Sequence, residues 1–232
     1  MKKNILTMML FAVAAIASVS CQKEAQNAPA QPVTLTFTSA NPETKTEWNE
    51  ENQTIWWSEK DKIRVACTAD GKWQDGNGDV AEGENAKFYE SAGLKVSEVT
   101  AKFVVPTDYK KENVGDKECQ FYAVYPSSAV KLNFKASVAD VTIPSLQTST
   151  LSFPNAADIL YGKSVEPHIG LPESSISMSW NRLVAHAYIT LKGINGIAEK
   201  ETINSITLTA QEGAALTGEF NLNVGHLQTS VA

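Results

Sequence analysis

Two stretches of the sequence decide the fold: VTLTFTS at residues 33–39 and ISMSW at residues 176–180. In both, large apolar residues alternate with threonine or serine. Successive side chains of a β-strand point to opposite faces, so this alternation predicts strands with one buried and one exposed face.

The same period of two recurs along the chain, and turn residues such as Asn195-Gly196 separate the segments. Beyond the first twenty residues, no apolar pattern with helical spacing extends over three turns. About a dozen short strands of this kind indicate an all-β fold and favour an antiparallel β-sandwich over a closed barrel. Further strands are predicted at residues 54–57, 62–68, 99–105, 118–125, 130–134, 138–143, 183–191, 203–209 and 215–222.

The N-terminus has the three parts of a secretion signal. Lys2 and Lys3 give a positive start, residues 5–17 form an apolar run, and small residues precede Cys21. The run is too short for a membrane-spanning helix, which needs about 20 apolar residues. A cysteine at this place resembles the bacterial lipobox, so we predict a signal peptide at residues 1–20 and acylation, for example with palmitate, at Cys21. The alternative is an ordinary secretory leader in which Cys21 is incidental.

Polar, Pro- and Ala-rich sequence follows Cys21, which suits a flexible tether at residues 21–32 ahead of a folded domain at residues 33–232. Two or three acyl chains hold a protein on a bilayer far more firmly than one. The stretch Gln22-Lys23-Glu24 resembles the export tag of surface lipoproteins. We therefore expect a lipid-anchored protein of the outer membrane that is exposed at the cell surface.

The charge of the chain restricts its partners. The leader contains two lysines and no acidic residue, so its removal changes the formal net charge from −6 to −8. A protein this acidic lacks the basic surface that binds nucleic acid or an anionic membrane surface.

Two cysteines, Cys67 and Cys119, remain besides Cys21, and each lies on the apolar side of its own predicted strand. In an oxidising cell envelope they could pair in a disulfide. The alternative is two buried free thiols, and the sequence favours it slightly.

No other pattern predicts catalysis or a cofactor. Residues 75–79 (DGNGD) have the spacing that begins a calcium loop, but Val80 and Ala86 stand where that loop needs glycine and glutamate. The three histidines are far apart, and the motifs of serine hydrolases, zinc proteases and nucleotide-binding loops are missing from the sequence. We therefore predict neither an enzyme nor a metal or cofactor site.

The tryptophans allow a second interpretation. Trp56 and Trp57 are adjacent on a predicted strand, so one faces the core and the other is exposed or covered by a neighbouring segment. An outward tryptophan can stack on a sugar ring or anchor a partner protein. Trp56 and Trp73 are the candidate exposed aromatic contacts.

Five short motifs follow one another in a characteristic order. The chain carries TKTEW at 44–48, IWWS at 55–58, DKIRV at 61–65, FYAVYP at 121–126 and IPSLQ at 143–147. Together they resemble the fimbrillin-like proteins of the Bacteroidetes, in which a T-[RK]-T-x-W element precedes a strand of the form W-x-x-x-D-x-I-x-V, and strands similar to FYAVYP and IPxxQ follow. The resemblance covers roughly residues 33–222, and strands similar to the later part of that domain occur at 183–191 and 203–208.

The resemblance implies a transthyretin-like β-sandwich, usually two in tandem, and a place among the subunits, anchors and tips of type V pili. In the pilins a protease removes the first strand of a lipidated precursor, and a strand of another subunit fills the groove. The removable strand would be residues 33–39, with Lys45 at the cleavage point where the pilins most characteristically have arginine. A second domain would be missing after Ala232, either because the reading frame is truncated or because this is a single-domain relative.

The function expected from the sequence is that of a fimbrillin-like cell-surface lipoprotein. It would act in pilus assembly or cell adhesion by strand exchange or through a binding surface, with other fimbrillin subunits or surface ligands as partners. The alternative is a glycan-binding outer-membrane lipoprotein that uses Trp56 or Trp73.

Overall fold

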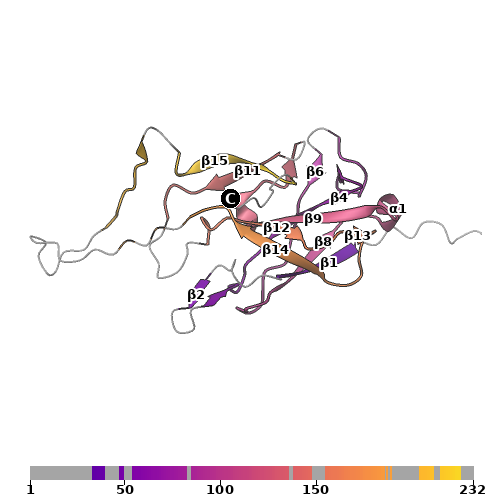
Figure 1. Cartoon of the computed structure of the whole chain (residues 1–232), viewed down its shortest axis with the longest axis horizontal. Coiled ribbons are helices and arrows are strands. Elements are labelled where there is room, and N and C mark those ends of the chain that lie inside the picture. Colours follow the sequence, from indigo (N-terminus) through magenta and orange to yellow (C-terminus); the bar gives the residue numbers. More distant parts are fainter. Residues whose placement is uncertain are drawn as a thin grey trace, which may run out of the picture. The chain divides into compact units, whose positions relative to one another are not determined.

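The computed structural model describes residues 33–39, 47–49, 54–82, 85–135, 138–147, 155–185, 187, 189, 204–211 and 215–225. Strands dominate these residues, which confirms the all-β class (Figure 1). The strands are β1 (Val33–Ser39), β2 (Glu47–Asn49), β3 (Thr54–Trp56), β4 (Arg64–Ala69), β5 (Lys72–Trp73), β6 (Ala86–Lys87), β7 (Tyr89–Glu90), β8 (Lys102–Thr107), β9 (Glu118–Tyr125), β10 (Asn133–Phe134), β11 (Val138–Ile143), β12 (Leu160–Ser164), β13 (His168–Ile169), β14 (Ile176–Arg182) and β15 (Gly218–Asn223). A four-residue helix, α1 (Lys111–Val114), and a 3-10 turn, η2 (Ser127–Ala129), lie between strands.

The largest sheet has the strand order β5-β4-β9-β12-β14-β1-β8, with β13 paired to β9 and β7 paired to β4. Three two-stranded sheets, β10-β6, β11-β15 and β2-β3, complete the described strands. All pairs in the largest sheet are antiparallel except β1 with β14, which run parallel. The sheet is therefore mixed, whereas the sequence analysis expected antiparallel pairing throughout. Alternation predicts which face a strand buries but not the direction of its neighbour.

The largest sheet curls around one apolar core. Strands from one end of the sheet to the other contribute to the same buried cluster: Leu35 and Phe37 from β1, Phe103 from β8, Phe121 from β9 and Val65 from β4. A flat sheet could not bring its outer strands β4 and β8 into one cluster, so the curl follows from this shared burial.

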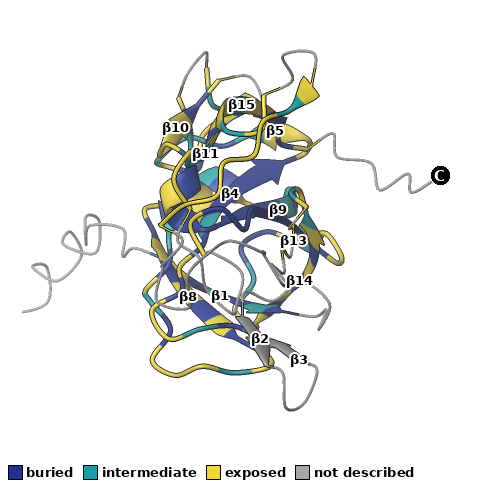
Figure 2. Cartoon of the chain, turned by 90° about the vertical axis from the view of Figure 1, so that its left-hand side faces the viewer, coloured by how far each residue is buried: buried dark blue, intermediate teal, exposed yellow. Residues whose placement is uncertain are grey.

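A second apolar cluster covers the opposite face of the middle strands. It is built from Tyr122 and Val124 of β9 and Tyr161 of β12, together with residues of the small β10-β6 and β11-β15 sheets. Strand β9 is therefore buried on both faces along most of its length (Figure 2). Its nearly continuous apolar sequence, FYAVY, fits a strand covered on both sides.

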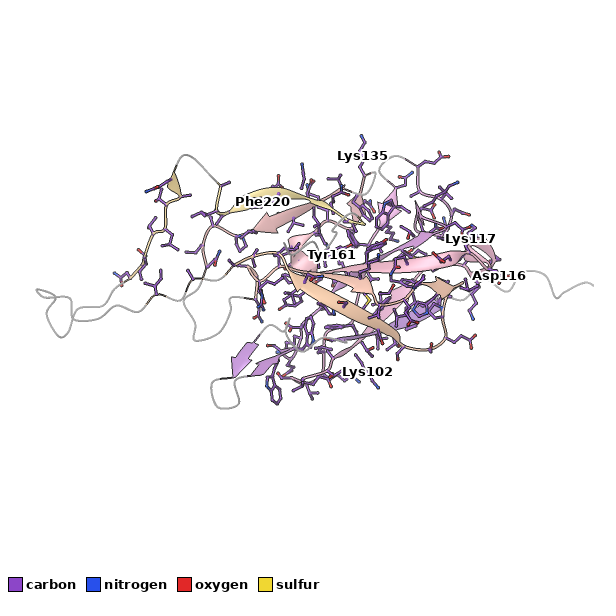
Figure 3. All side chains as sticks on the ribbon, viewed as in Figure 1. Lys102, Asp116, Lys117, Lys135, Tyr161 and Phe220 are labelled. Carbon is purple, nitrogen blue, oxygen red and sulfur yellow. The ribbon has the colours of Figure 1, made fainter. Side chains whose placement is uncertain are left out.

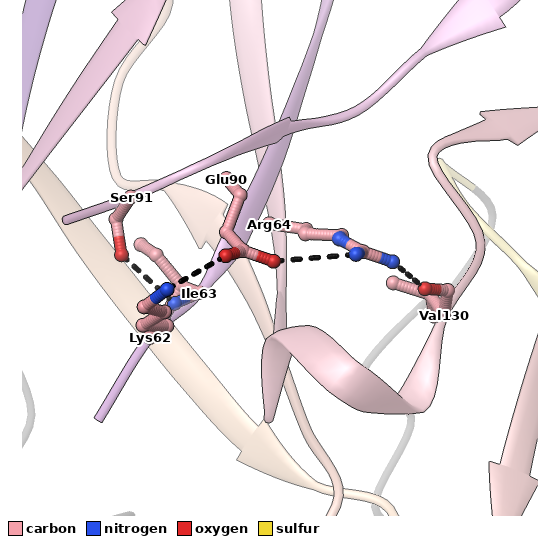
Figure 4. A network of polar contacts seen from close by, with 6 residues as sticks. All are labelled: Lys62, Ile63, Arg64, Glu90, Ser91 and Val130. Carbon is pink, nitrogen blue, oxygen red and sulfur yellow. Dashed lines mark hydrogen bonds and ion pairs between the residues drawn. The ribbon is translucent and has the colours of Figure 1, made fainter. Parts of the chain in front are cut away.

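The segment around β7 joins β4 to β8, the strand at the far end of the curled sheet. Strand β7 pairs with β4, and just beyond it the Ala92 amide donates to the Val104 carbonyl of β8 at 2.9 Å. A polar network holds β7 in place (Figure 4). Glu90 accepts from Lys62 Nζ at 2.9 Å and from Arg64 Nη2 at 3.2 Å, and Arg64 Nη1 donates to the Val130 carbonyl.

Two strand predictions are wrong in the part of the chain that the structure describes. Residues 183–185, 187 and 189 form no strand, and neither do residues 204–209. Ile206 and Leu208, which were expected to face a core, are 53% and 60% exposed. The alternation is present in the sequence, but a strand needs a neighbour to satisfy its backbone and cover its apolar face.

Candidate functional site at the first strand

Strand β1 occupies a slot between β8 and β14. Six residue pairs join it to β8, from Val33 with Thr107 to Thr38 with Lys102, and three pairs join it to β14. Side-chain hydrogen bonds add to the ladders. Thr107 Oγ1 donates to the Val33 carbonyl at 2.7 Å, and Thr38 Oγ1 donates to the Ile176 carbonyl at 3.3 Å. An N-terminal segment is thus built into the interior of the sheet and not added at its edge.

The side chains of β1 alternate as the sequence predicted. Leu35, Phe37 and Ser39 are buried, whereas Thr34 is exposed and Thr36 is half-buried. The Phe37 ring packs edge-on against Phe121 of β9, with 5.5 Å between ring centroids. Strand β1 therefore places two large apolar side chains, Leu35 and Phe37, in the main core, and Ser39 is buried beyond them.

Removal of β1 would leave a defined groove. It would expose core side chains of the neighbouring strands, and it would leave the facing backbone groups of β8 and β14 without partners. The groove would run the length of β8, from Thr107 to Lys102, which is labelled in Figure 3. Such a groove can bind an extended peptide by strand addition. The unpaired backbone groups would form hydrogen bonds with the peptide, and the apolar pockets would accept its alternate side chains.

Cys21 and Lys45, the predicted lipidation and cleavage positions, both lie outside the described residues. The first described residue after Lys45 is Glu47, which begins β2. Acylation of Cys21 and cleavage at Lys45 therefore stay predictions.

The adjacent tryptophans face opposite ways. Trp57 is fully buried and packs edge-on against Phe103, Tyr125 and Trp180, with ring centroids 5.0–5.4 Å apart. Trp56 is half-buried. Of the two, Trp56 alone presents surface to a ligand.

Trp73 is also half-buried, and other rings engage it. Its centroid lies 5.1 Å from that of Tyr122 and 5.0 Å from that of Phe134. It packs against the second apolar cluster and helps to cover the outer face of β9. This packing leaves only part of the ring for a sugar, and the glycan-binding role of Trp56 and Trp73 stays a prediction.

The Asp75–Asp79 loop is stabilised by its own hydrogen bonds. Asp75 Oδ1 accepts from the Asn77 and Asp79 amides at 2.7 and 3.1 Å, and Asp79 Oδ2 accepts from Asn113 Nδ2 at 3.1 Å. Among the described residues, no group of three or more metal-ligating side chains gathers at one place. These contacts explain the aspartates as turn-forming residues.

Cys67 and Cys119 are brought together by the fold. Both are buried free thiols in the main core, on the paired strands β4 and β9. Burial raises the pKa of the Cys67 thiol, whereas interaction with the Cys67 side chain lowers the pKa of Cys119. The sequence showed that each cysteine faces a core, but not that the two share one.

What the sequence could not reveal about the site is the surroundings of β1. Its neighbours β8 and β14 follow it in the chain by more than 60 and more than 130 residues, and Thr38 and Ile176 alone are separated by 138 positions. No local signal specifies such pairing. The sequence also gives no sign that Thr107 donates a hydrogen bond to the Val33 carbonyl, because threonines are common in strands.

Comparison with known proteins identifies the family. The family model described as fimbrillin-like matches residues 44–232, which is most of the chain. No curated protein and no solved structure matches the chain. In the described part of the chain, no helix has the length and apolar character that crossing a bilayer would take. The chain therefore belongs to the fimbrillin-like family, a family of structural subunits, and this membership indicates the role of a pilus subunit at the cell surface.

Proposed function

We propose that this protein is a lipid-anchored fimbrial subunit whose first strand, β1, is exchanged for a strand of another subunit. The observation that carries the proposal is the position of β1. It lies inside the largest sheet, bonded on both sides, and it delivers Leu35 and Phe37 to the main core. A strand so placed can be replaced only by another strand with a similar pattern.

The boundaries along the chain support the same proposal. The match to the family begins at residue 44, after β1 ends at Ser39, and Lys45 lies at that boundary. A cut after Lys45 by a trypsin-like protease would separate β1 from all the other strands. The separated strand would then be held by hydrogen bonds and burial alone, and a donor of matching pattern could displace it.

The N-terminus of the cell-surface protein tests strand exchange. We expect mass spectrometry to find two forms, a precursor that begins at acylated Cys21 and an assembled form that begins at Thr46. If every molecule in the assembled fraction begins at acylated Cys21, exchange through β1 is wrong and a stationary anchor role replaces it.

Replacement of the predicted lipid site tests the anchor separately. We expect Cys21→Ala to move the protein from the membrane fraction to the soluble fraction, because no acyl chain can be attached. Ser20→Ala keeps a small residue before the cysteine and should leave the protein on the membrane. Membrane retention of the Cys21→Ala protein would show that lipid at Cys21 is not the anchor.

A further inference from the structure

The structure brings Cys67 and Cys119 to one place in the main core. Cys67 lies in β4, and Cys119 is the second residue of the neighbouring strand β9. In the register, Cys67 is opposite Phe121 and Cys119 is opposite Ala69, so the cysteines are diagonal neighbours on the same face of the sheet. Both side chains belong to the main core, and they are close enough for each thiol to shift the pKa of the other. The Cys67 thiol donates to the Thr68 carbonyl at 3.2 Å, and the Cys119 thiol lies 3.7 Å from the Lys117 carbonyl.

The ends of the two strands are fastened together beside this pair. The Asp70 amide donates to the Glu118 carbonyl at 2.8 Å, and the Glu118 amide donates to Asp70 Oδ1 at 2.9 Å. Asp70 and Gly71 form the turn that ends β4, both with positive φ. The two cysteines are therefore held near each other by the pairing of β4 with β9 and by the two hydrogen bonds between Asp70 and Glu118, the residue before Cys119.

The placement of the two cysteines allows a cross-strand bridge after a backbone shift. Diagonal neighbours in an ideal antiparallel pair are about 7–8 Å apart, whereas the Cα atoms of a disulfide are usually about 4.4–6.8 Å apart. The right-handed twist of a sheet shortens one of the two diagonals. Because both thiols lie on the same face of the paired strands and in the same apolar cluster, a shift at the ends of β4 and β9 would bring the sulfur atoms together.

We propose that Cys67 and Cys119 form a structural disulfide that joins β4 to β9 when the chain folds in an oxidising cell envelope. The oxidant is a disulfide-containing thiol oxidoreductase. Its disulfide takes two electrons from the pair, one S–S bond forms in the fimbrillin-like chain, and the oxidant is released with two thiols. The proposal is independent of strand exchange at β1, since β4 and β9 both follow Lys45 and would stay in the processed protein.

Both thiols are fully buried in the folded chain, so the oxidant reaches them while β4 and β9 are still forming. One thiolate attacks the disulfide of the oxidant and forms a mixed disulfide. The other thiolate then attacks the cysteine sulfur of that mixed disulfide, which expels the oxidant as a thiol.

Thiol counting in the full chain tests the proposal. The protein is expressed with its own leader in a bacterium with an oxidising periplasm, and the envelope fraction is denatured and alkylated without reductant. We expect no alkylation of Cys67 or Cys119 and a cross-linked peptide that contains both. Alkylation should appear at both after reduction. Two fully alkylated cysteines without prior reduction would overturn the proposal.

Thermal unfolding gives a second measurement. We expect reductant to lower the midpoint of the wild-type protein by about 10 °C, because a bridge over so long a loop restricts the unfolded chain. The double variant Cys67→Ala/Cys119→Ala should show no response to reductant, and each single variant should leave one alkylatable thiol. A wild-type midpoint that reductant does not change would contradict the bridge.

Discussion

At the scale of single residues, Trp57 is the centre of the main core. Its ring contacts Phe103 of β8, Tyr125 of β9 and Trp180 of β14. We expect Trp57→Ala to lower the free energy of unfolding by about 3–5 kcal/mol, because the cavity would lie between three strands. Trp56→Ala, on the neighbouring half-buried residue, is the control and should cost much less. Chemical denaturation measures both, and equal losses would show that the two rings do not differ in burial.

Glu90 predicts a dependence of stability on pH. The hydrogen bond from Lys62, with further attraction from Arg64, lowers the pKa of Glu90, so the ionised carboxylate favours the folded state. The contribution is complete above about pH 4.3, the pKa of an unfolded glutamate, and is lost as the pH falls through the lower folded value.

The Glu90→Gln variant tests this dependence. Since Glu90 is partly exposed, we expect the variant to be less stable than the wild type by about 1 kcal/mol or less at pH 7. The difference should shrink as the pH is lowered below about 4.3. A difference that stays constant from pH 7 to pH 3 would mean that the charge of Glu90 does not matter.

At the scale of elements, the contact between β12 and β14 depends on a glycine. A Cβ atom at Gly162 would lie 2.8 Å from the Trp180 ring, inside the main core. We expect Gly162→Ala to cost about 1–3 kcal/mol through overpacking. Gly76→Ala is the control, since its Cβ would meet only the flexible Lys87 side chain and Tyr89 at 3.4 Å or more. Equal stabilities of the two variants would show that Trp180 can move aside freely.

The elements also show how far the sequence predicts this fold. The strands at 33–39, 118–125 and 138–143 were predicted with the bounds that the structure shows, because each alternates or is continuously apolar and has a partner. The segment at 203–209 alternates as well, yet residues 204–209 are not a strand and Leu208 is exposed. Local pattern specifies which face can be buried, while pairing depends on residues far away in the chain.

Part of the candidate site could likewise be predicted from the sequence and part could not. The alternation at residues 33–39 predicted that Leu35 and Phe37 are buried, and the resemblance to fimbrillins indicated that this strand is the one to be exchanged. The neighbours of β1 could not be predicted from the sequence. Strand β8 pairs antiparallel with one side of β1 and β14 pairs parallel with the other, and this arrangement depends on the pairing of distant segments in the curled sheet. The contact between Cys67 and Cys119 has the same origin, since it depends on the register of β4 with β9.

At the scale of the whole molecule, two apolar clusters share the middle strands, and only one of them involves β1. Leu35 and Phe37 belong to the main cluster, whereas Tyr122 and Tyr161 belong to the second, which contains no residue of β1. The β10-β6 and β11-β15 sheets and their contacts would therefore stay in place when β1 leaves. This division supports the proposed exchange, in which the subunit would keep the rest of its fold while β1 is replaced.

The most direct test of the central claim is strand replacement in a cleaved chain. A specific protease site is placed between Ser39 and Glu47, and the cleaved protein is incubated with a labelled peptide of residues 33–39. We predict that the labelled peptide replaces β1 and stays bound through gel filtration. A peptide with alanine in place of Leu35 and Phe37 should not bind. Retention of neither peptide, or equal retention of both, would contradict an exchangeable strand recognised through its buried side chains.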